Sequence, residues 1–208
     1  MRRKAWVVTV AVLLAGATAG GVLMLRAAGG GGAPAVTSRT DYGSHHRPAV
    51  TEIATFAAGC FWKLEHAMRR VDGVVATTAG YTGGAELSPT HANVSTGHTS
   101  HAEAVRVEFD PSVVSYEALL DVFWKSHDPA QFAREPGEPP SPGRSVVFYH
   151  TDNQRAAAAA SKRRLISAGK GPAEIPTEIL AAHTFFPAEA EHQQFLDKRG
   201  GNASCRFR

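Results

Sequence analysis

The sequence predicts an α+β fold, a single two-layer domain that follows one membrane-spanning segment. First, apolar runs of strand length alternate with helical patterns from residue 52 to residue 198. Second, residues 102–109 alternate between apolar and polar side chains, as in a strand with one covered and one open face. Third, residues 5–25 are apolar and carry no charge. With 43% hydrophobic and 20% charged residues, the composition is ordinary for a globular protein with a packed core.

The N-terminal quarter predicts an anchor and a linker. Residues 5–25 are long enough to cross a hydrocarbon core of about 30 Å and exceed the apolar region of a cleaved signal peptide, usually ~7–15 residues. The basic residues 2–4 before them favour a cytoplasmic N-terminus. We therefore predict that residues 1–26 form an uncleaved signal anchor, which spans the cell membrane once and leaves the domain outside the cytoplasm. Secretion after signal cleavage is the alternative. The Gly-, Ala-, Pro- and Ser-rich residues 27–51 predict a flexible linker.

The domain itself is predicted over residues 52–198, followed by a mobile tail over residues 199–208. Ser115 and Thr151 are the expected N-caps of two helices, and Gly169 the expected end of the second. The first predicted elements are a strand over 53–58, a helix over 60–70, a strand over 74–79 leading into the glycine-rich 80–84, an irregular polar segment over 86–100 and a strand over 102–109. A helix over 116–126, a Pro-rich loop to 143, a strand over 145–149 and a helix to 168 are expected next. The last elements are an edge strand or strand pair over 175–184 and a short helix around 189–198.

Charge and residue counts exclude several functions. A net charge of +3 with no basic stripe argues against nucleic-acid binding. Two cysteines cannot form a disulfide scaffold or a four-cysteine metal site. The ten histidines include several in loop-like sequence without helical spacing, so we expect no metal site.

Cys60 stands where the first apolar strand meets the first helical pattern. A cysteine at a helix N-terminus lies among unpaired backbone N–H groups and the positive end of the helix dipole, which favour the thiolate. Cys60 is therefore a candidate nucleophile, although a small buried side chain is the commoner role of a free cysteine. Phe61 and Trp62 are expected either to form an apolar wall beside it or simply to belong to the core.

Several segments carry a resemblance to one family. They are residues 55–62 (TFAAGCFW) with Glu65, 79–84 (AGYTGG), 101–105 (HAEAV), 110–111 (DP), 127–129 (HDP), 177–179 (TEI) and 192–194 (HQQ). In this order they resemble the A-type peptide methionine sulfoxide reductases, and the resemblance covers residues 53–205. It implies helices packed around a mixed, largely antiparallel sheet with a ferredoxin-like core.

The resemblance also implies a reaction, the reduction of methionine (S)-sulfoxide in proteins and in small molecules. Cys60 would attack the sulfur, and Glu103 would protonate the oxygen, because its small apolar neighbours favour the protonated carboxyl. Tyr81 would donate a second hydrogen bond, unless it only anchors a turn. Asp128 would orient the site, unless it only ends a helix before a proline. Glu65 is expected to support helix and loop geometry rather than to react.

The remaining implied roles concern substrate and recycling. Phe61 and Trp62 would hold the methyl group of the substrate. The sulfenic acid formed on Cys60 would be resolved by Cys205 in the glycine-containing tail, and a thioredoxin-like reductant would recycle the disulfide. The implied partners are oxidised proteins or peptides, free methionine sulfoxide and this reductant. We expect a monomer, and no cofactor.

One position departs from the family pattern. Immediately before Arg144 the family usually carries a second active-site tyrosine, and Gly143 stands there in this chain. The preceding residues 138–142 (EPPSP) also replace an Asp- and Gly-containing segment. The departure puts efficiency and substrate preference in question more than the reaction type.

Two other functions remain open at this stage. A thiol peroxidase or disulfide exchanger using Cys60 and Cys205 would react rapidly with hydrogen peroxide and would not prefer (S)-sulfoxides. A membrane-tethered methionine-binding module with a degenerate site would keep its function when Cys60 is replaced by serine.

Overall fold

The computed structural model describes residues 50–129, 140–169 and 175–201, all within one compact unit, Ser44–Arg208. The predicted anchor and nearly all of the predicted linker lie outside these residues, as do most of the Pro-rich loop and Cys205. Within the described ranges, no helix has the length and apolar character needed to cross a bilayer. The anchor therefore stays a prediction.

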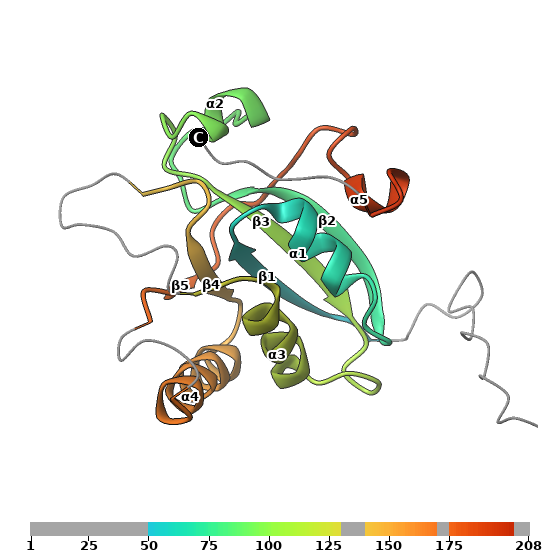
Figure 1. Ribbon diagram of the computed structural model, residues 1–208, viewed down its shortest axis with the longest axis vertical. Helices are drawn as coiled ribbons and strands as arrows, with labels where there is room; N and C mark the ends of the chain where they lie inside the picture. Colours follow the sequence, from blue (N-terminus) through green and yellow to red (C-terminus); the bar gives the residue numbers. More distant parts are fainter. Residues whose placement is uncertain (1–49, 130–139, 170–174, 202–208) are drawn as a thin grey trace, which may run out of the picture. The chain divides into compact units, whose positions relative to one another are not determined.

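The strands of the described residues form one mixed sheet in the order β5-β4-β1-β3-β2-β6 (Figure 1). All neighbouring strands are antiparallel except β4 and β5, which confirms the predicted, largely antiparallel sheet. The order β4-β1-β3-β2, with helices between β1 and β2 and between β3 and β4, is that of a ferredoxin-like core. The strands are β1 (Glu52–Ala58), β2 (Val74–Thr82), β3 (Ala102–Phe109), β4 (Ser145–Tyr149), β5 (Glu178–Ala181) and β6 (Phe186–Pro187).

Helices α1 and α3 pack side by side against one face of this sheet (Figure 1). Phe56 of β1 stacks on Phe123 of α3 at 5.4 Å between ring centroids, and both side chains are fully buried. Leu64 and Met68 of α1 complete this core from the neighbouring helix. The helices are α1 (Phe61–Met68), α2 (His91–Ser95), α3 (Tyr116–Ser126), α4 (Asp152–Ser167) and α5 (Phe195–Lys198).

The predicted helix ends are confirmed by their caps. The hydroxyl of Ser115 accepts a hydrogen bond from the amide of Ala118, and the hydroxyl of Thr151 accepts one from Gln154, both at 3.2 Å. Gly169 follows α4 with a φ of +61°, a left-handed conformation that favours glycine and ends the helix. These local signals fix the start of α3, which precedes β4 in the chain, and both ends of α4, which follows it.

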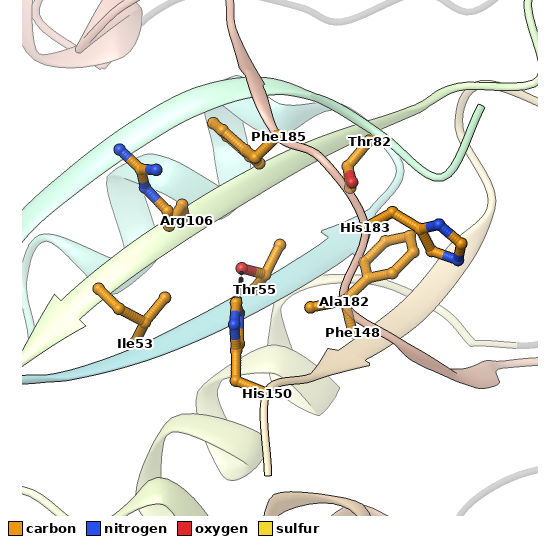
Figure 2. Close-up of a pocket in the computed structure, with 9 residues that line it drawn as sticks. All are labelled: Ile53, Thr55, Thr82, Arg106, Phe148, His150, Ala182, His183 and Phe185. Carbon is orange, nitrogen blue, oxygen red and sulfur yellow. Dashed lines mark hydrogen bonds between the residues drawn. The ribbon is translucent and has the colours of Figure 1, made fainter. Parts of the chain in front are cut away.

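The prediction of one open sheet face is wrong at the centre of the sheet. Ala57, Ala104 and Phe148 point away from the helices but are fully buried, because Ala182 and Phe185 from the segment after β5 pack over them. A hollow of about 280 Å³ is left on this face (Figure 2). It is lined by Ile53, Thr55, Thr82, Arg106, Phe148, His150, Ala182, His183 and Phe185.

Two short elements were not predicted. Strand β6 pairs with β2 through Gly80 and Tyr81, and it is too short to show any periodicity in the sequence. A Cβ atom at residue 80 would collide with the carbonyl oxygen of Phe186, so glycine is required for this pairing. Helix α2 lies inside the segment predicted to be irregular, and it is only one turn long with a Thr90–Asn93 capping box. Both elements matter because they carry or position residues of the site.

Candidate active site

Cys60 occupies the N-cap of α1, as predicted. Strand β1 ends at Ala58, and Gly59 turns the chain with a φ of +74°. Cys60 then takes an extended conformation, and its carbonyl oxygen accepts hydrogen bonds from Lys63 and Leu64 at 3.2 and 3.4 Å. Its residue surface is 7% exposed. The sulfur therefore belongs to a residue at the positive end of a helix, where a thiolate is stabilised.

Glu103 is tied to the same helix end. One carboxylate oxygen, Oε2, accepts a hydrogen bond from the amide of Phe61 at 3.3 Å, so the acid lies next to the residue that follows Cys60. Glu103 is only 3% exposed. This burial raises the pKa of Glu103 to about 7, against the opposing effect of the Phe61 hydrogen bond. The carboxyl is thus half-protonated near neutral pH and able to donate a proton.

Phe61 and Trp62 form an aromatic cluster with residues from distant parts of the chain. Phe61 is fully buried and contacts Tyr81 and His192, at 5.9 and 5.8 Å between ring centroids. Trp62 is partly exposed and stacks face to face on Phe195 at 3.8 Å. Because Trp62 is the more exposed of the two, it is the better placed to meet a substrate.

Tyr81 is buried in this cluster, but its hydroxyl is already engaged. It donates a hydrogen bond to Oε2 of Glu189 at 2.8 Å. Burial and this bond raise the pKa of Tyr81 well above its usual range, so the phenol stays protonated. The arrangement favours the anchoring role that the sequence left open for Tyr81. Its donation to a substrate oxygen stays a prediction, and it would require a change of partner.

The loop before β4 lies directly against Glu103. The backbone amide of Glu103 donates to the carbonyl oxygen of Pro142 at 2.8 Å, and the next residue, Gly143, is buried. The position where the family usually has a tyrosine therefore lies in a loop that is hydrogen-bonded to the backbone of Glu103. Asp128 is exposed two residues beyond the end of α3, and its orienting role stays a prediction.

Glu65 supports the site as expected rather than facing it. Its two oxygens accept hydrogen bonds from the hydroxyl of Thr77 at 3.1 Å and from the amide of Gln194 at 2.7 Å. Gln194 has a φ of 54°, an unusual conformation for a residue other than glycine, and the bond to Glu65 holds it there. Glu65 thereby fixes the segment that brings His192 and Phe195 onto the aromatic cluster.

Three residues of the site were missed at the level of sequence: His91, Glu189 and His192. Nε2 of His91 lies 3.8 Å from Oε1 of Glu103, and its ring lies 4.3 Å from the ring of His192. Glu189 accepts hydrogen bonds from both Tyr81 and the amide of His91. Only His192 had a signal, since it opens the matched segment 192–194. Among residues 50–129, 140–169 and 175–201, no three His, Cys, Asp or Glu side chains are arranged to hold a metal ion.

Comparisons with known proteins agree with this geometry. Residues 52–208 match the family model described as "Peptide methionine sulfoxide reductase". The chain is 52% identical over 149 residues to "Peptide methionine sulfoxide reductase MsrA" of Methanosarcina mazei, a match that covers 72% of this chain and 71% of that protein.

Solved structures share the fold. Mxr1 from Saccharomyces cerevisiae in reduced form aligns with a TM-score of 0.67 and 31% identity, over 77% of this chain and 92% of that chain. Mxr1 in complex with Trx2 aligns with a TM-score of 0.50 and 26% identity, over 74% of this chain and 91% of that chain. From the family model and the identity to a curated relative, we conclude that this chain belongs to the peptide methionine sulfoxide reductases and is an oxidoreductase.

Proposed function

We propose that the chain reduces methionine (S)-sulfoxide, in proteins and as a small molecule, with Cys60 as nucleophile and Glu103 as general acid. The observation that carries this proposal is the link between the two residues. Cys60 caps α1, and the amide of the next residue, Phe61, holds the carboxyl of Glu103, whose pKa is raised to about 7. A nucleophile and a neutral acid thus meet at one helix end.

The proposed chemistry balances as follows. The Cys60 thiolate forms a bond to the sulfoxide sulfur while Glu103 transfers its proton to the sulfoxide oxygen. The sulfur–oxygen bond of the substrate and the new sulfur–sulfur bond then break, and the hydroxyl passes to the Cys60 sulfur. Methionine leaves as the reduced product, Cys60 is oxidised to a sulfenic acid, and Glu103 is left as a carboxylate. Phe61 and Trp62 are proposed to hold the substrate methyl group against the aromatic cluster.

A stereospecific assay tests this function. Peptides carrying the separated (S)- and (R)-sulfoxides are incubated with the protein and dithiothreitol, and methionine formation is followed. We expect turnover of the (S)-sulfoxide only. Equal turnover of both forms, or faster consumption of hydrogen peroxide than of either, would favour the thiol peroxidase instead.

For recycling we propose that Cys205 resolves the sulfenic acid and that a thioredoxin-like protein reduces the resulting disulfide, with no bound cofactor. The support is indirect, since Cys205 lies outside the described residues. It is the only other cysteine of the chain, and the structure of Mxr1 with Trx2 shows that a relative meets such a partner.

Replacing Cys205 by serine is expected to separate the two halves of the cycle. Steady-state turnover with thioredoxin should fall by at least about tenfold, because the proposed Cys60–Cys205 disulfide that thioredoxin attacks can no longer form. Dithiothreitol should restore part of the activity by reducing the sulfenic acid directly. A variant that cycles with thioredoxin as well as the parent does would rule out the resolving role.

Gly143 offers a second prediction, because its loop lies against Glu103. Its backbone does not adopt a positive φ angle, so a residue with a side chain adds no left-handed strain there. Gly143→Tyr is expected to raise kcat or lower KM for the sulfoxide about 2- to 10-fold, the effect of one added hydrogen bond of roughly 0.5–1.5 kcal/mol. Gly143→Phe is the matched control with the ring but no hydroxyl. If both variants change the kinetics equally, the hydroxyl plays no part.

We further propose that residues 1–26 anchor the protein in the cell membrane with the catalytic domain outside the cytoplasm. The support is the uncharged apolar stretch 5–25 after three basic residues. We expect the full-length protein in the membrane fraction and its domain open to protease added to intact spheroplasts. Recovery in the soluble cytoplasmic fraction would refute the anchor, and recovery in the medium would indicate signal cleavage.

A further inference from the structure

The backbone of His91 is held firmly at the edge of the site. His91 is the first residue of α2, whose N-terminus is closed by a capping box between Thr90 and Asn93. Its amide also donates to Oε1 of Glu189 at 2.9 Å. The other oxygen of Glu189 accepts from Tyr81, so α2 is connected through one carboxylate to strand β2. His91 is therefore positioned by two independent sets of hydrogen bonds.

Its side chain is equally well packed. The imidazole stacks on Phe61 at 6.0 Å and on Trp62 at 6.1 Å, and the ring of His192 lies 4.3 Å away. The side chain remains 34% exposed. The ring is thus oriented by aromatic contacts while one part of it is open to the site's surroundings.

The ring nitrogen nearest Glu103 has no hydrogen bond within the described part of the chain. Nε2 of His91 lies 3.8 Å from Oε1 of Glu103, which is too far for a direct hydrogen bond. That same oxygen accepts no hydrogen bond from a described residue, and the amide of Phe61 binds the other oxygen, Oε2. Two hydrogen-bonding atoms thus face each other across a gap, and both side chains contact Phe61, the residue after the nucleophile.

The size of this gap fits a shared acceptor. Two donors that each lie about 2.8 Å from one oxygen atom are about 3.8 Å apart when the angle at that oxygen is roughly 85°. A sulfoxide oxygen has lone pairs for both donors. The protonated carboxyl of Glu103 and the N–H of His91 could each supply one hydrogen bond to it.

We propose that His91 is a second catalytic residue, which donates a hydrogen bond from Nε2 to the sulfoxide oxygen while Glu103 transfers its proton to the same atom. The donor stabilises the charge that builds on this oxygen as the Cys60 sulfur attacks. This inference rests on the proposed nucleophile and acid, and it adds the group that holds the oxygen between them.

The charged and titratable groups around His91 are consistent with a neutral donor. Burial and the neighbouring His192 lower the pKa of His91, while Glu189 opposes them. Glu103 faces the ring from β3, and Tyr81 from β2 is bonded to Glu189. An imidazole that is neutral near pH 7 carries one N–H, so the donor role requires this hydrogen on Nε2.

The test uses the full-length chain and single-turnover reduction of a peptide (S)-sulfoxide, which isolates the chemical step from recycling. His91→Phe keeps a stacking ring but removes the donor, and His91→Gln restores a donor without the ring. We expect His91→Phe to slow the chemical step about 10²-fold with little change in the apparent substrate affinity. His91→Gln should recover most of this loss.

A second measurement separates this role from an effect on the nucleophile. Alkylation of reduced Cys60 by iodoacetamide involves no sulfoxide oxygen, so its rate should be the same in the parent and in His91→Phe. An unchanged single-turnover rate in His91→Phe would overturn the proposal. So would equal losses in both variants, or a parallel loss of alkylation rate. Failure of the proposed function itself is distinguishable, because it would appear in the parent protein as an absence of (S)-sulfoxide reduction.

Discussion

Replacing Cys60 by serine is expected to abolish methionine sulfoxide reduction, with a loss of at least about 10⁴-fold, the range seen when a catalytic nucleophile is removed. A serine hydroxyl is similar in shape to the thiol, but its high pKa leaves almost no alkoxide at neutral pH, even at a helix N-terminus. The variant also cannot take up oxygen as a sulfenic acid. Methionine formation from the (S)-sulfoxide under single-turnover conditions measures the loss.

The control for this experiment is the fold. Cys60 is 7% exposed, and its carbonyl oxygen rather than its side chain holds the first turn of α1. The serine variant should therefore unfold within a few degrees of the reduced parent, in which Cys60 forms no disulfide. A folded and inactive variant supports the nucleophile. A folded variant that keeps the full biological function of the parent would instead favour the methionine-binding module, which needs no thiol.

The second large effect is expected for Glu103→Gln, a loss of roughly 10²–10⁴-fold, the usual contribution of a positioned general acid. The amide has the same shape and can still accept the hydrogen bond of Phe61 through its oxygen. It cannot transfer a proton to the sulfoxide. Single-turnover rates of the two proteins at pH 6 measure the difference. An unchanged rate would leave Glu103 as a strand residue without a catalytic role.

The pH dependence of the parent follows from the raised pKa of Glu103. The acid is protonated below its pKa of about 7, so the rate of the chemical step should fall as the pH rises through this value, by about tenfold per unit above it. Glu103→Gln should lack this alkaline limb. A parent rate that stays flat between pH 6 and pH 9 would contradict proton donation by Glu103.

The same group links stability to pH. Because the folded-state pKa is raised from 4.5 to about 7, the folded protein binds this proton more tightly than the unfolded chain. This proton contributes up to about 3 kcal/mol to the free energy of unfolding. The contribution is fully present below about pH 4.5 and is lost as the pH rises through 7. Glu103→Gln removes this loss, so it should gain unfolding free energy relative to the parent between pH 5 and pH 8.5, measured by denaturant titration.

The parts of the site that could be predicted from the sequence are the residues whose positions depend on short contiguous segments. Cys60 was recognisable because a strand pattern changes to a helix pattern at that residue. Glu103 was recognisable because small apolar neighbours surround it within one strand. Each of these depends on residues a few positions away, and the structure confirms both placements.

The residues that could not be predicted depend on contacts between distant segments. His91 lies in a segment with no periodic pattern, and Glu189, about 100 positions later, binds its amide and helps to hold it at the site. The hydroxyl of Tyr81 is directed toward the same carboxylate. Phe185 covers the second sheet face from a segment that shows no strand alternation. The secondary-structure propensity of a short segment cannot predict these contacts, since they form only when the sheet and the C-terminal segment pack together.

The most direct test of the central claim is to identify which residue is oxidised when the sulfoxide is reduced. Cys205→Ser protein is mixed with one equivalent of peptide (S)-sulfoxide without any reductant, then treated with dimedone and digested for mass spectrometry. The account predicts one dimedone adduct on Cys60 for each methionine formed, and no adduct with the (R)-sulfoxide. Methionine formation with no sulfenic acid on Cys60 would contradict it.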